Sequence, residues 1–354
     1  MNLIDLRLRN QRLTNSAFRD PADVVTWLGA VQAQDYPGAK WGVGLRTPGL
    51  TSDGFDRAFD EGRILRTHIL RPTWHFVPRA DIRWMLSLSA PRVHAATASY
   101  SRKLELDCKR VAKSHAVFVR ALRGGRSRTR AELSAALDRA GIIAKGQRLA
   151  HLMFHAELDQ VVCSGPRRGK QFTYMLLDER APDAVSLDRD AALAELTLRF
   201  FRSHGPATVR DFVWWSGLTV KEAREGLESI GKSVVQEKVG GLTYWIVPSR
   251  AAAPSGKGSV YLLPNYDEYL IAYKDRGTVQ RLPITTDAPR GFDIYAHLLV
   301  VDGKFAGTWR RAEKAGRVQI STTPFEPFKR VHAKALAVQA ERMAAFSGTE
   351  TEIV

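Results

Sequence analysis

Residues 208–247, TVRDFVWWSGLTVKEAREGLESIGKSVVQEKVGGLTYWIV, carry the clearest local signals of secondary structure in the chain. Thr208 and Thr219 each stand directly before a run whose apolar residues have helical spacing. Because a threonine hydroxyl accepts hydrogen bonds from the first free backbone amides of a helix, both positions predict helix starts. We therefore expect helices over Val209–Trp215 and Val220–Ile230.

The second half of this stretch predicts a β-hairpin. Residues 234–239 and 242–247 resemble β-strands in composition, and Gly240-Gly241 separates them. Two glycines between strands suit the positive φ angles of a two-residue primed turn. A further helix is expected over Leu193–Ser203, before the helix breakers Gly205-Pro206. Three helices followed by a hairpin form a winged-helix module.

The preceding segment has the same order of elements. The spacing of apolar residues predicts an amphipathic helix over 114–122. Thr129 and Glu132 have the spacing of a capping box, which predicts the start of a second helix, and a third follows over Gln147–Gln160. Two β-like runs then flank the turn 165–169. This order predicts another winged-helix module.

The two ends of the chain are less regular. The N-terminal part begins helical and ends in a helix over Arg79–Leu88, and we interpret it as a third, modified winged helix. Residues 248–258 predict a linker. Beyond it, β-like runs and a closing helix indicate a small β-domain, with strands over 261–263, 294–301, 303–309 and 317–320 and the helix over 333–346. The sequence thus predicts an α+β fold with domains over 1–107, 108–185, 186–248 and 249–354.

Composition limits the class of protein. Of 354 residues, 44% are hydrophobic and 25% are charged, which is typical of a soluble chain that forms sizeable cores. We expect no membrane span because no run of 18 apolar residues occurs, and the N-terminus does not resemble a secretory signal. Cys108 and Cys163 have neither metal-ligand spacing nor the density of a disulfide scaffold. We expect a cytoplasmic protein without a metal or cofactor.

The charge of the chain indicates a polyanionic partner. The net charge is +16, and residues 109–170 hold 14 Lys and Arg against four acids, a local balance of +10. A positive field raises the local concentration of nucleic acid. An even spread of arginines for solubility would explain the total but not this concentration in about a sixth of the chain. The distribution therefore favours a nucleic-acid binding surface.

The segment WLGAVQAQDYP, residues 27–37, carries the first candidate chemistry. Its apolar residues form a helical stripe, and Pro37 disfavours a helical Tyr36, so we expect a helix that ends between Gln32 and Asp35. In the extended residues that follow, side chains two apart face the same way. Gln32 and Gln34 would then present two neutral amides that hold a water beside a cationic reaction centre. The alternative is that both amides are solvated or bind the backbone.

Two further clusters stand out. Arg71, Trp74 and His75 surround a proline and suit contact with a phosphate and stacking on a sugar or base. The alternative is a strand with a buried Trp and a satisfied His. Asp267 and Glu268 suggest acid–base work, but we favour an anchor at a domain junction, with Arg276 as the partner. The sequence contains no Gly-rich phosphate loop, zinc spacing or nucleophile elbow.

Three motifs together carry a resemblance to a known family. They are Gln32-Ala33-Gln34, then RPTWHFV at 71–77, and LPNYDEYL at 263–270 with Asp275-Arg276. In this order and spacing the chain resembles the winged-helix DNA glycosylases of the AlkZ and YcaQ type, over nearly its whole length. The resemblance implies three tandem winged helices in a concave, basic arrangement, with a small C-terminal β-barrel-like domain.

The resemblance also implies a function. It implies a monofunctional glycosylase that excises bulky or cationic N7-alkylpurines from double-stranded DNA, and in some members unhooks interstrand crosslinks. Gln32 and Gln34 match the family's catalytic element of Gln, an apolar residue and Gln or Asp, and the glutamine at the third position favours the azinomycin-resistance type. An N7-alkylpurine is already cationic, so the chemistry reduces to positioning water at C1′. We expect a monomer associated with the nucleoid.

The expected DNA contacts come from the second cluster and from the basic residues of the two later modules. They are Arg71, Trp74, His75, Arg128, Arg130, Arg148, Arg167, Arg168, Lys170 and Lys238. Two alternatives stay open. One is a transcription regulator that binds DNA without chemistry, although regulators commonly dimerise on paired half-sites and no dimerisation helix is evident. The other is a specialist that excises a single genotoxic natural-product lesion.

Overall fold

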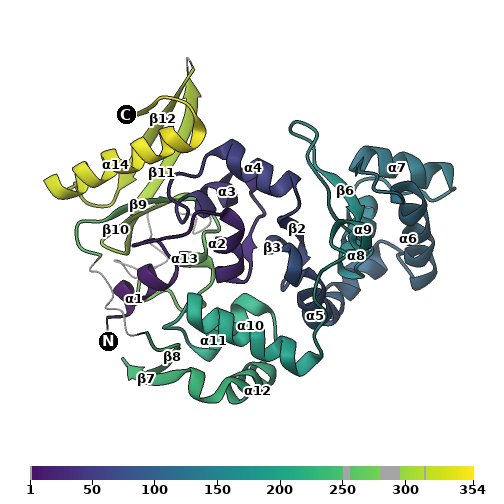
Figure 1. Cartoon of the computed structure of the whole chain (residues 1–354), viewed down its shortest axis with the longest axis horizontal. Helices are drawn as coiled ribbons and strands as arrows, with labels where there is room; N and C mark the ends of the chain where they lie inside the picture. The colour runs from purple at the N-terminus through teal and green to yellow at the C-terminus, as the bar shows by residue number, and fades with distance from the viewer. Residues whose placement is uncertain (1, 250–255, 280–295, 315) are drawn as a thin grey trace.

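The computed structural model describes residues 2–249, 256–279, 296–314 and 316–354. It is a mixed α+β structure in which the N-terminal region occupies the centre (Figure 1). The segment after residue 108 lies on one side of this centre, the segment after 186 lies below it, and the C-terminal sheet and helix lie on the other side (Figure 1). The later segments together therefore surround the N-terminal region, which contains the glutamine motif.

The N-terminal region places a small sheet among helices. The elements are α1 Leu3–Asn10, α2 Pro21–Leu28, β1 Val31–Gln32, α3 Tyr36–Gly44, α4 Ser52–Asp60, β2 Ile64–Ile69, β3 Thr73–Pro78, η1 Arg79–Asp81 and α5 Ile82–Lys103. The sheet is antiparallel in the order β1-β3-β2, with Gln32 opposite His75. The short edge strand β1 thus carries Gln32.

The predicted end of the helix before the glutamines was wrong. Helix α2 ends at Leu28 because Gly29 has φ +81°, so Gln32 is extended rather than helical. Tyr36, which we expected to be extended before Pro37, is instead the first residue of α3, and the extended residue is Asp35. The Tyr36 ring packs edge-on against Phe55, Phe59 and Phe76. This aromatic contact outweighs the local preference of a residue before proline.

The predicted end of the later helix was also wrong. Helix α5 does not stop at Leu88 but continues to Lys103 with Pro91 inside it. The second half of α5 packs against α8, and its residues Val93 and Ser101 are buried. Tertiary packing therefore holds the helix together beyond a proline that local rules treat as a stop.

The segment after residue 108 has the predicted order. It contains α6 Cys108–Leu122, β4 Arg128–Thr129, α7 Arg130–Arg139, α8 Gln147–Leu158, β5 Val162–Ser164, β6 Thr173–Leu176 and α9 Leu177–Arg180. The capping box of Thr129 and Glu132 is present, as the sequence predicted. Strand β6 pairs with both β4 and β5, and a separate core lies among the three helices.

The segment after residue 186 confirms the elements of the opening stretch. It contains α10 Arg189–Ser203, α11 Val209–Ser216, α12 Val220–Ile230, η2 Gly231–Ser233, β7 Val235–Val239 and β8 Leu242–Ile246. Thr208 and Thr219 both cap their helices through capping boxes. Gly240 and Gly241 have φ +57° and +79°, as a primed two-residue turn requires.

The C-terminal segment forms the predicted small β-domain. Its elements are β9 Val260–Leu263, α13 Glu268–Ile271, β10 Leu298–Val301, β11 Lys304–Lys314, β12 Arg317–Pro324, α14 Arg330–Ser347 and β13 Thr351–Ile353. The sheet order is β13-β12-β11-β10-β9, and α14 lies against it (Figure 1). Parts of the predicted linker and of the predicted strand 294–301 lie outside the described residues.

The N-terminal region shares its apolar cores with the later segments. One core joins Leu65 and Met85 to Phe200 and Trp215. Another joins Leu8, Trp41 and Leu45 to the C-terminal sheet and to α14. In the described part of the chain, no helix is long and apolar enough to cross a membrane. Cys108 and Cys163 are free, the first exposed and the second buried.

Candidate active site

The glutamine motif lies at the edge strand β1 of the central sheet, where the N-terminal region meets the C-terminal segment. Gln32 is buried, and its side-chain oxygen accepts a hydrogen bond from Arg71 Nη2 at 2.7 Å. Its backbone N–H donates to Glu268 Oε1 at 2.8 Å. Gln32 is therefore fixed from both ends, and its amide oxygen is already occupied.

Glu268 is a buried carboxylate directly behind Gln32. Its second oxygen accepts from Trp215 Nε1 at 2.9 Å and lies 3.3 Å from His204 Nε2. Burial raises the pKa of Glu268, but the contact with His204 and the amide of Gln32 outweigh burial and lower the pKa below its ordinary value. An ionised, fully hydrogen-bonded carboxylate thus fixes the strand that carries the motif.

Gln34 differs from Gln32 in being exposed. Its side-chain oxygen accepts a long and weak hydrogen bond from the backbone N–H of Trp74, at 3.4 Å. The strand around it is firmly held, since Ala33 N–H donates to the Trp74 carbonyl at 2.7 Å and Arg66 Nε donates to the Ala33 carbonyl at 3.0 Å. The motif therefore presents one accessible amide on a rigid support.

An aromatic pocket opens beside the Trp74 side chain. Trp74 forms one wall, with the His68 ring packed against it at 4.3 Å between centroids and the Arg66 guanidinium 4.3 Å from its ring centroid. The cavity, about 180 Å³, is also lined by Pro72, Arg130, Ala150, His151, Met153, Phe154 and Tyr174. His68 is held by the buried carboxylate of Glu157. Such a pocket suits a flat group with an anion near Arg130.

His75 does not offer the surface contact that the sequence suggested. Its ring is fully buried opposite Gln32, and Nδ1 lies 3.0 Å from the Thr73 carbonyl, so Nδ1–H donates there. Nε2 has no hydrogen-bond partner among the described residues. Burial and then the charge of Arg71 lower the pKa of His75 to about 3. His75 is therefore a neutral residue of the support behind the motif.

This burial predicts an acid sensitivity. In the unfolded chain the His75 ring takes up a proton near pH 6.5, whereas in the folded protein it stays neutral down to about pH 3. Protonation therefore favours unfolding as pH falls below 6.5. Between pH 7 and pH 5, we expect wild type to lose roughly 2 kcal/mol more unfolding free energy than His75→Gln. Urea denaturation at both pH values measures this, and an equal loss in both proteins would contradict it.

The acidic pair is an anchor, as predicted, but with a different partner. Asp267 accepts two hydrogen bonds from Arg46, at 2.8 Å each, and both side chains are 2% exposed. Arg276, the partner that the sequence suggested, donates instead to the Leu270 carbonyl at 3.4 Å. The ion pair of Arg46 and Asp267 links the end of α3 to the turn before α13. Glu268 follows Asp267 directly. The anchor thus sets the position of the carboxylate behind Gln32.

The predicted DNA contacts divide into two groups. Arg130, Arg168, Lys170 and Lys238 are exposed, and Trp74 is half-buried at the pocket. Two arginines are instead occupied within the protein, since Arg71 binds Gln32 and Arg167 binds Asp56 at 3.0 Å. Arg148 forms an exposed ion pair with Glu105 at 2.8 Å.

One acidic residue, Glu132 of α7, lies beside two of the predicted DNA-binding arginines. Arg128 and Arg168 lie 3.6 Å and 3.0 Å from the same carboxylate, Glu132. Hydrogen bonds from Thr129 and Arg168 lower the pKa of Glu132 to about 2. Exposed ion pairs contribute little to the free energy of unfolding. A DNA phosphate can therefore replace Glu132 as the partner of either arginine with little loss of stability.

Comparisons with known proteins cover nearly the whole chain. The family model described as DNA glycosylase AlkZ-like matches residues 25–346. The interstrand DNA cross-link repair glycosylase of Streptomyces sahachiroi is 24% identical to this chain over an alignment of 357 positions. The alignment covers 97% of this chain and 95% of that protein. The solved Streptomyces sahachiroi DNA glycosylase AlkZ is similar in fold, with a TM-score of 0.81 and 22% identity over 100% of this chain and 98% of that one.

Proposed function

The chain belongs to the AlkZ-like DNA glycosylase family, and from this premise we propose that it is a monofunctional glycosylase that excises cationic N7-alkylpurines. The observation that carries the proposal is the exposed amide of Gln34 on a rigid, buried support. Its weak hydrogen bond to Trp74 is easily replaced by one to water. Gln34 would then orient the water that attacks C1′, and Gln32 would hold the strand in register.

The charge of the support suits this reaction. Alkylation at N7 makes the base a good leaving group, so no strong general acid is needed. The developing oxocarbenium-like sugar is cationic, and a neutral amide oxygen stabilises it without competing charge. The fixed negative charge of Glu268, buried behind Gln32, adds to this field.

We propose that the DNA lies along three tandem winged helices. The segments after residues 108 and 186 each contain a hairpin that follows three longer helices, α6 to α8 and α10 to α12, and the N-terminal region contributes the motif. The exposed cations on their wings, Lys170 and Lys238, are suited to phosphate contacts. A concave arrangement of these modules would bring both wings to one duplex while Gln34 meets the damaged sugar.

Bulky adducts and interstrand crosslinks are the substrates we favour within this class. The aromatic pocket at Trp74 is large enough for the alkyl or aryl part of a lesion, and Trp74 offers a stacking face. The curated relative from Streptomyces sahachiroi is named as an interstrand cross-link repair glycosylase. A pocket beside the motif would leave the modified base in the duplex, without deep extrusion.

The test uses purified full-length protein and duplex DNA that carries one N7-methylguanine or one nitrogen-mustard crosslink. We expect alkali-labile abasic sites at the modified guanine, with no strand cleavage before alkali, and none in the unmodified duplex. Cleavage without alkali would contradict the monofunctional assignment. Tight, salt-sensitive binding of both duplexes without abasic sites would instead favour a non-catalytic DNA-binding protein.

A further inference from the structure

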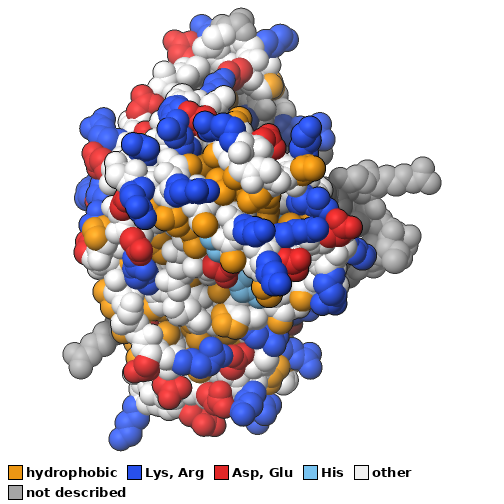
Figure 2. All heavy atoms as spheres, turned by 90° about the vertical axis from the view of Figure 1, so that its right-hand side faces the viewer, with side chains coloured by type: hydrophobic (Ala, Val, Ile, Leu, Met, Phe, Trp, Pro, Cys, Tyr) orange, Lys and Arg blue, Asp and Glu red, His pale blue; other side chains and the backbone are white. Residues whose placement is uncertain are grey.

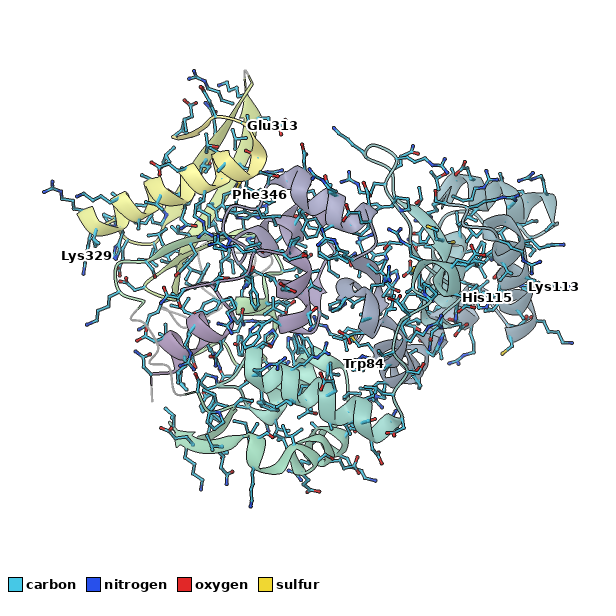
Figure 3. All side chains as sticks on the ribbon, in the orientation of Figure 1. Trp84, Lys113, His115, Glu313, Lys329 and Phe346 are labelled. Atoms are coloured by element: carbon cyan, nitrogen blue, oxygen red, sulfur yellow. The ribbon has the colours of Figure 1, made fainter. Side chains whose placement is uncertain are left out.

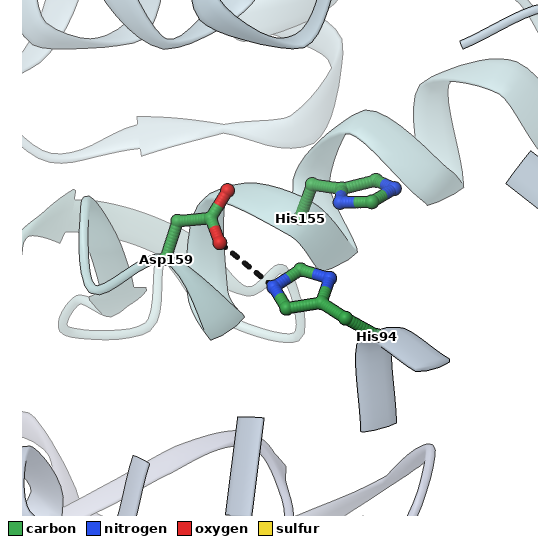
Figure 4. A group of neighbouring side chains, drawn as sticks. All are labelled: His94, His155 and Asp159. Carbon is green, nitrogen blue, oxygen red and sulfur yellow. Dashed lines mark hydrogen bonds and ion pairs between the residues drawn. The ribbon is translucent and has the colours of Figure 1, made fainter. Parts of the chain in front are cut away.

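Three helices bring metal-ligating side chains together away from the glutamine motif. His94 lies on α5, and His155 and Asp159 lie at the C-terminal end of α8. One ligand atom from each of the three lies within 4.8 Å of the others. Figure 4 shows the His94 ring directed at Asp159, with the His155 ring alongside. Within the described residues, this is the one group of three or more such side chains with this spacing.

The contacts within the group are close. His94 Nε2 lies 2.7 Å from Asp159 Oδ1, and the rings of His94 and His155 stack at 5.1 Å between centroids. His155 Nε2 lies 3.1 Å from Ser101 Oγ. A ligand imidazole commonly uses its other nitrogen to hydrogen-bond a neighbour that fixes the ring. Ser101 is placed to do this for His155.

A third imidazole, that of His115, is the fourth side chain of the group. His115 on α6 directs Nε2 to within 3.7 Å of Asp159 Oδ2. This nitrogen is buried and has no hydrogen-bond partner among the described residues. In Figure 3 Lys113 points away from the molecule, whereas His115, two residues further along α6, lies on its inner side. An inward imidazole nitrogen with no hydrogen bond is available to a cation.

The four side chains share one cavity. A space of about 340 Å³ is lined by His94, His115, His155 and Asp159, with Leu106, Cys108, Val111 and Ala112. On this side of the molecule, histidine atoms reach the surface between Lys and Arg side chains (Figure 2). One carboxylate therefore faces three imidazoles, in a cavity with a path from solvent.

We propose that His94, His155, Asp159 and His115 bind one Zn²⁺ that ties α5 to α6 and α8. Three imidazoles and one carboxylate are a donor set that zinc accepts in tetrahedral geometry, with bonds of about 2.0–2.2 Å. The separations of up to 4.8 Å among the first three donors must shorten by roughly 1–2 Å around the ion, which small side-chain rotations achieve. The site lacks an obvious sequence signature because its ligands come from three helices.

The position of the site gives the ion a structural role. Helix α8 also carries Glu157, whose carboxylate holds His68 against Trp74 beside Gln34. Zinc at the end of α8 would fix this helix relative to α5, and thereby the wall of the aromatic pocket. The reaction itself would not need the ion, because no ligand of the site contacts Gln32 or Gln34.

The experiment titrates Zn²⁺ into tag-free, full-length protein that has been treated with a chelator and then freed of it. Calorimetry should give about one site per chain, and His94→Gln and Asp159→Asn should each weaken it at least about tenfold. The matched control is His332→Gln, because His332 forms a similar pair with Asp302, at 3.2 Å, far along the chain. This control should bind Zn²⁺ like wild type.

A second measurement tests the role in folding. Zn²⁺ should raise the thermal midpoint of wild type and of His332→Gln, but not that of His94→Gln. Circular dichroism of the metal-free variants checks that they are folded. Co²⁺ should give the intense visible bands of a four-coordinate site, weakened in His115→Gln. Equal Zn²⁺ affinity in wild type and in both ligand variants, or no binding by wild type, would overturn the proposal.

Discussion

Replacing Gln34 by alanine is expected to lower the rate of excision of an N7-alkylpurine by about 100-fold or more, with duplex affinity nearly unchanged. The side chain is exposed and makes one weak contact, so its loss removes a water-positioning amide and little else. Single-turnover excision and equilibrium binding of the same duplex measure the two effects separately. An excision rate that remains within a few-fold of wild type would refute the role of Gln34.

The matched controls separate chemistry from folding. Gln236 is an exposed glutamine on β7, and Gln236→Ala should leave excision unchanged. Gln32→Ala should also lower excision, but with a second effect. It leaves the Arg71 guanidinium without its 2.7 Å contact in a buried site, which costs about 1–3 kcal/mol of unfolding free energy. Activity loss without destabilisation is therefore the expected signature of Gln34 alone.

The sequence predicted the elements whose causes are local. The capping-box spacing of Thr129 and Glu132 placed the start of α7, and Thr208 and Thr219 before runs of helical spacing placed the starts of α11 and α12. The two glycines at 240–241 placed the hairpin, since only positive φ angles close that turn. These signals involve residues at most a few positions apart. Local rules did not place the ends of α2 and α5, where packing overrides propensity.

The candidate site was predicted in part. The motif itself was visible as two glutamines around an alanine, and the resemblance to a family gave it a role. What fixes it was not visible, because Glu268 lies 236 residues from Gln32. Nor does a sequence distinguish an arginine on the surface, such as Arg168, from one occupied within the protein, such as Arg71. The same limit hid the His94 group, whose members come from three helices.

Breaking the buried pair of Arg46 and Asp267 is expected to have the largest effect on stability. All five N–H donors of Arg46 are used, two on Asp267 and the others on the Gly42 carbonyl and on Gln11. Asp267→Ala leaves this guanidinium buried without a countercharge, which costs about 3–5 kcal/mol of unfolding free energy. Urea denaturation measures it, with the exposed pair Arg317 and Glu350 as a control, where Glu350→Gln should cost under about 1 kcal/mol.

The double variant decides whether the charge or the packing matters. Arg46→Met with Asp267→Leu removes both charges and keeps apolar volume, so it should be clearly more stable than Asp267→Ala alone. Because Glu268 follows Asp267 and its carboxylate accepts the backbone N–H of Gln32, the turn must also keep its place for excision. We expect the double variant to fold but to excise more slowly than wild type. Stability equal to that of Asp267→Ala would mean that the turn depends on the hydrogen bonds themselves rather than on pairing of the charges.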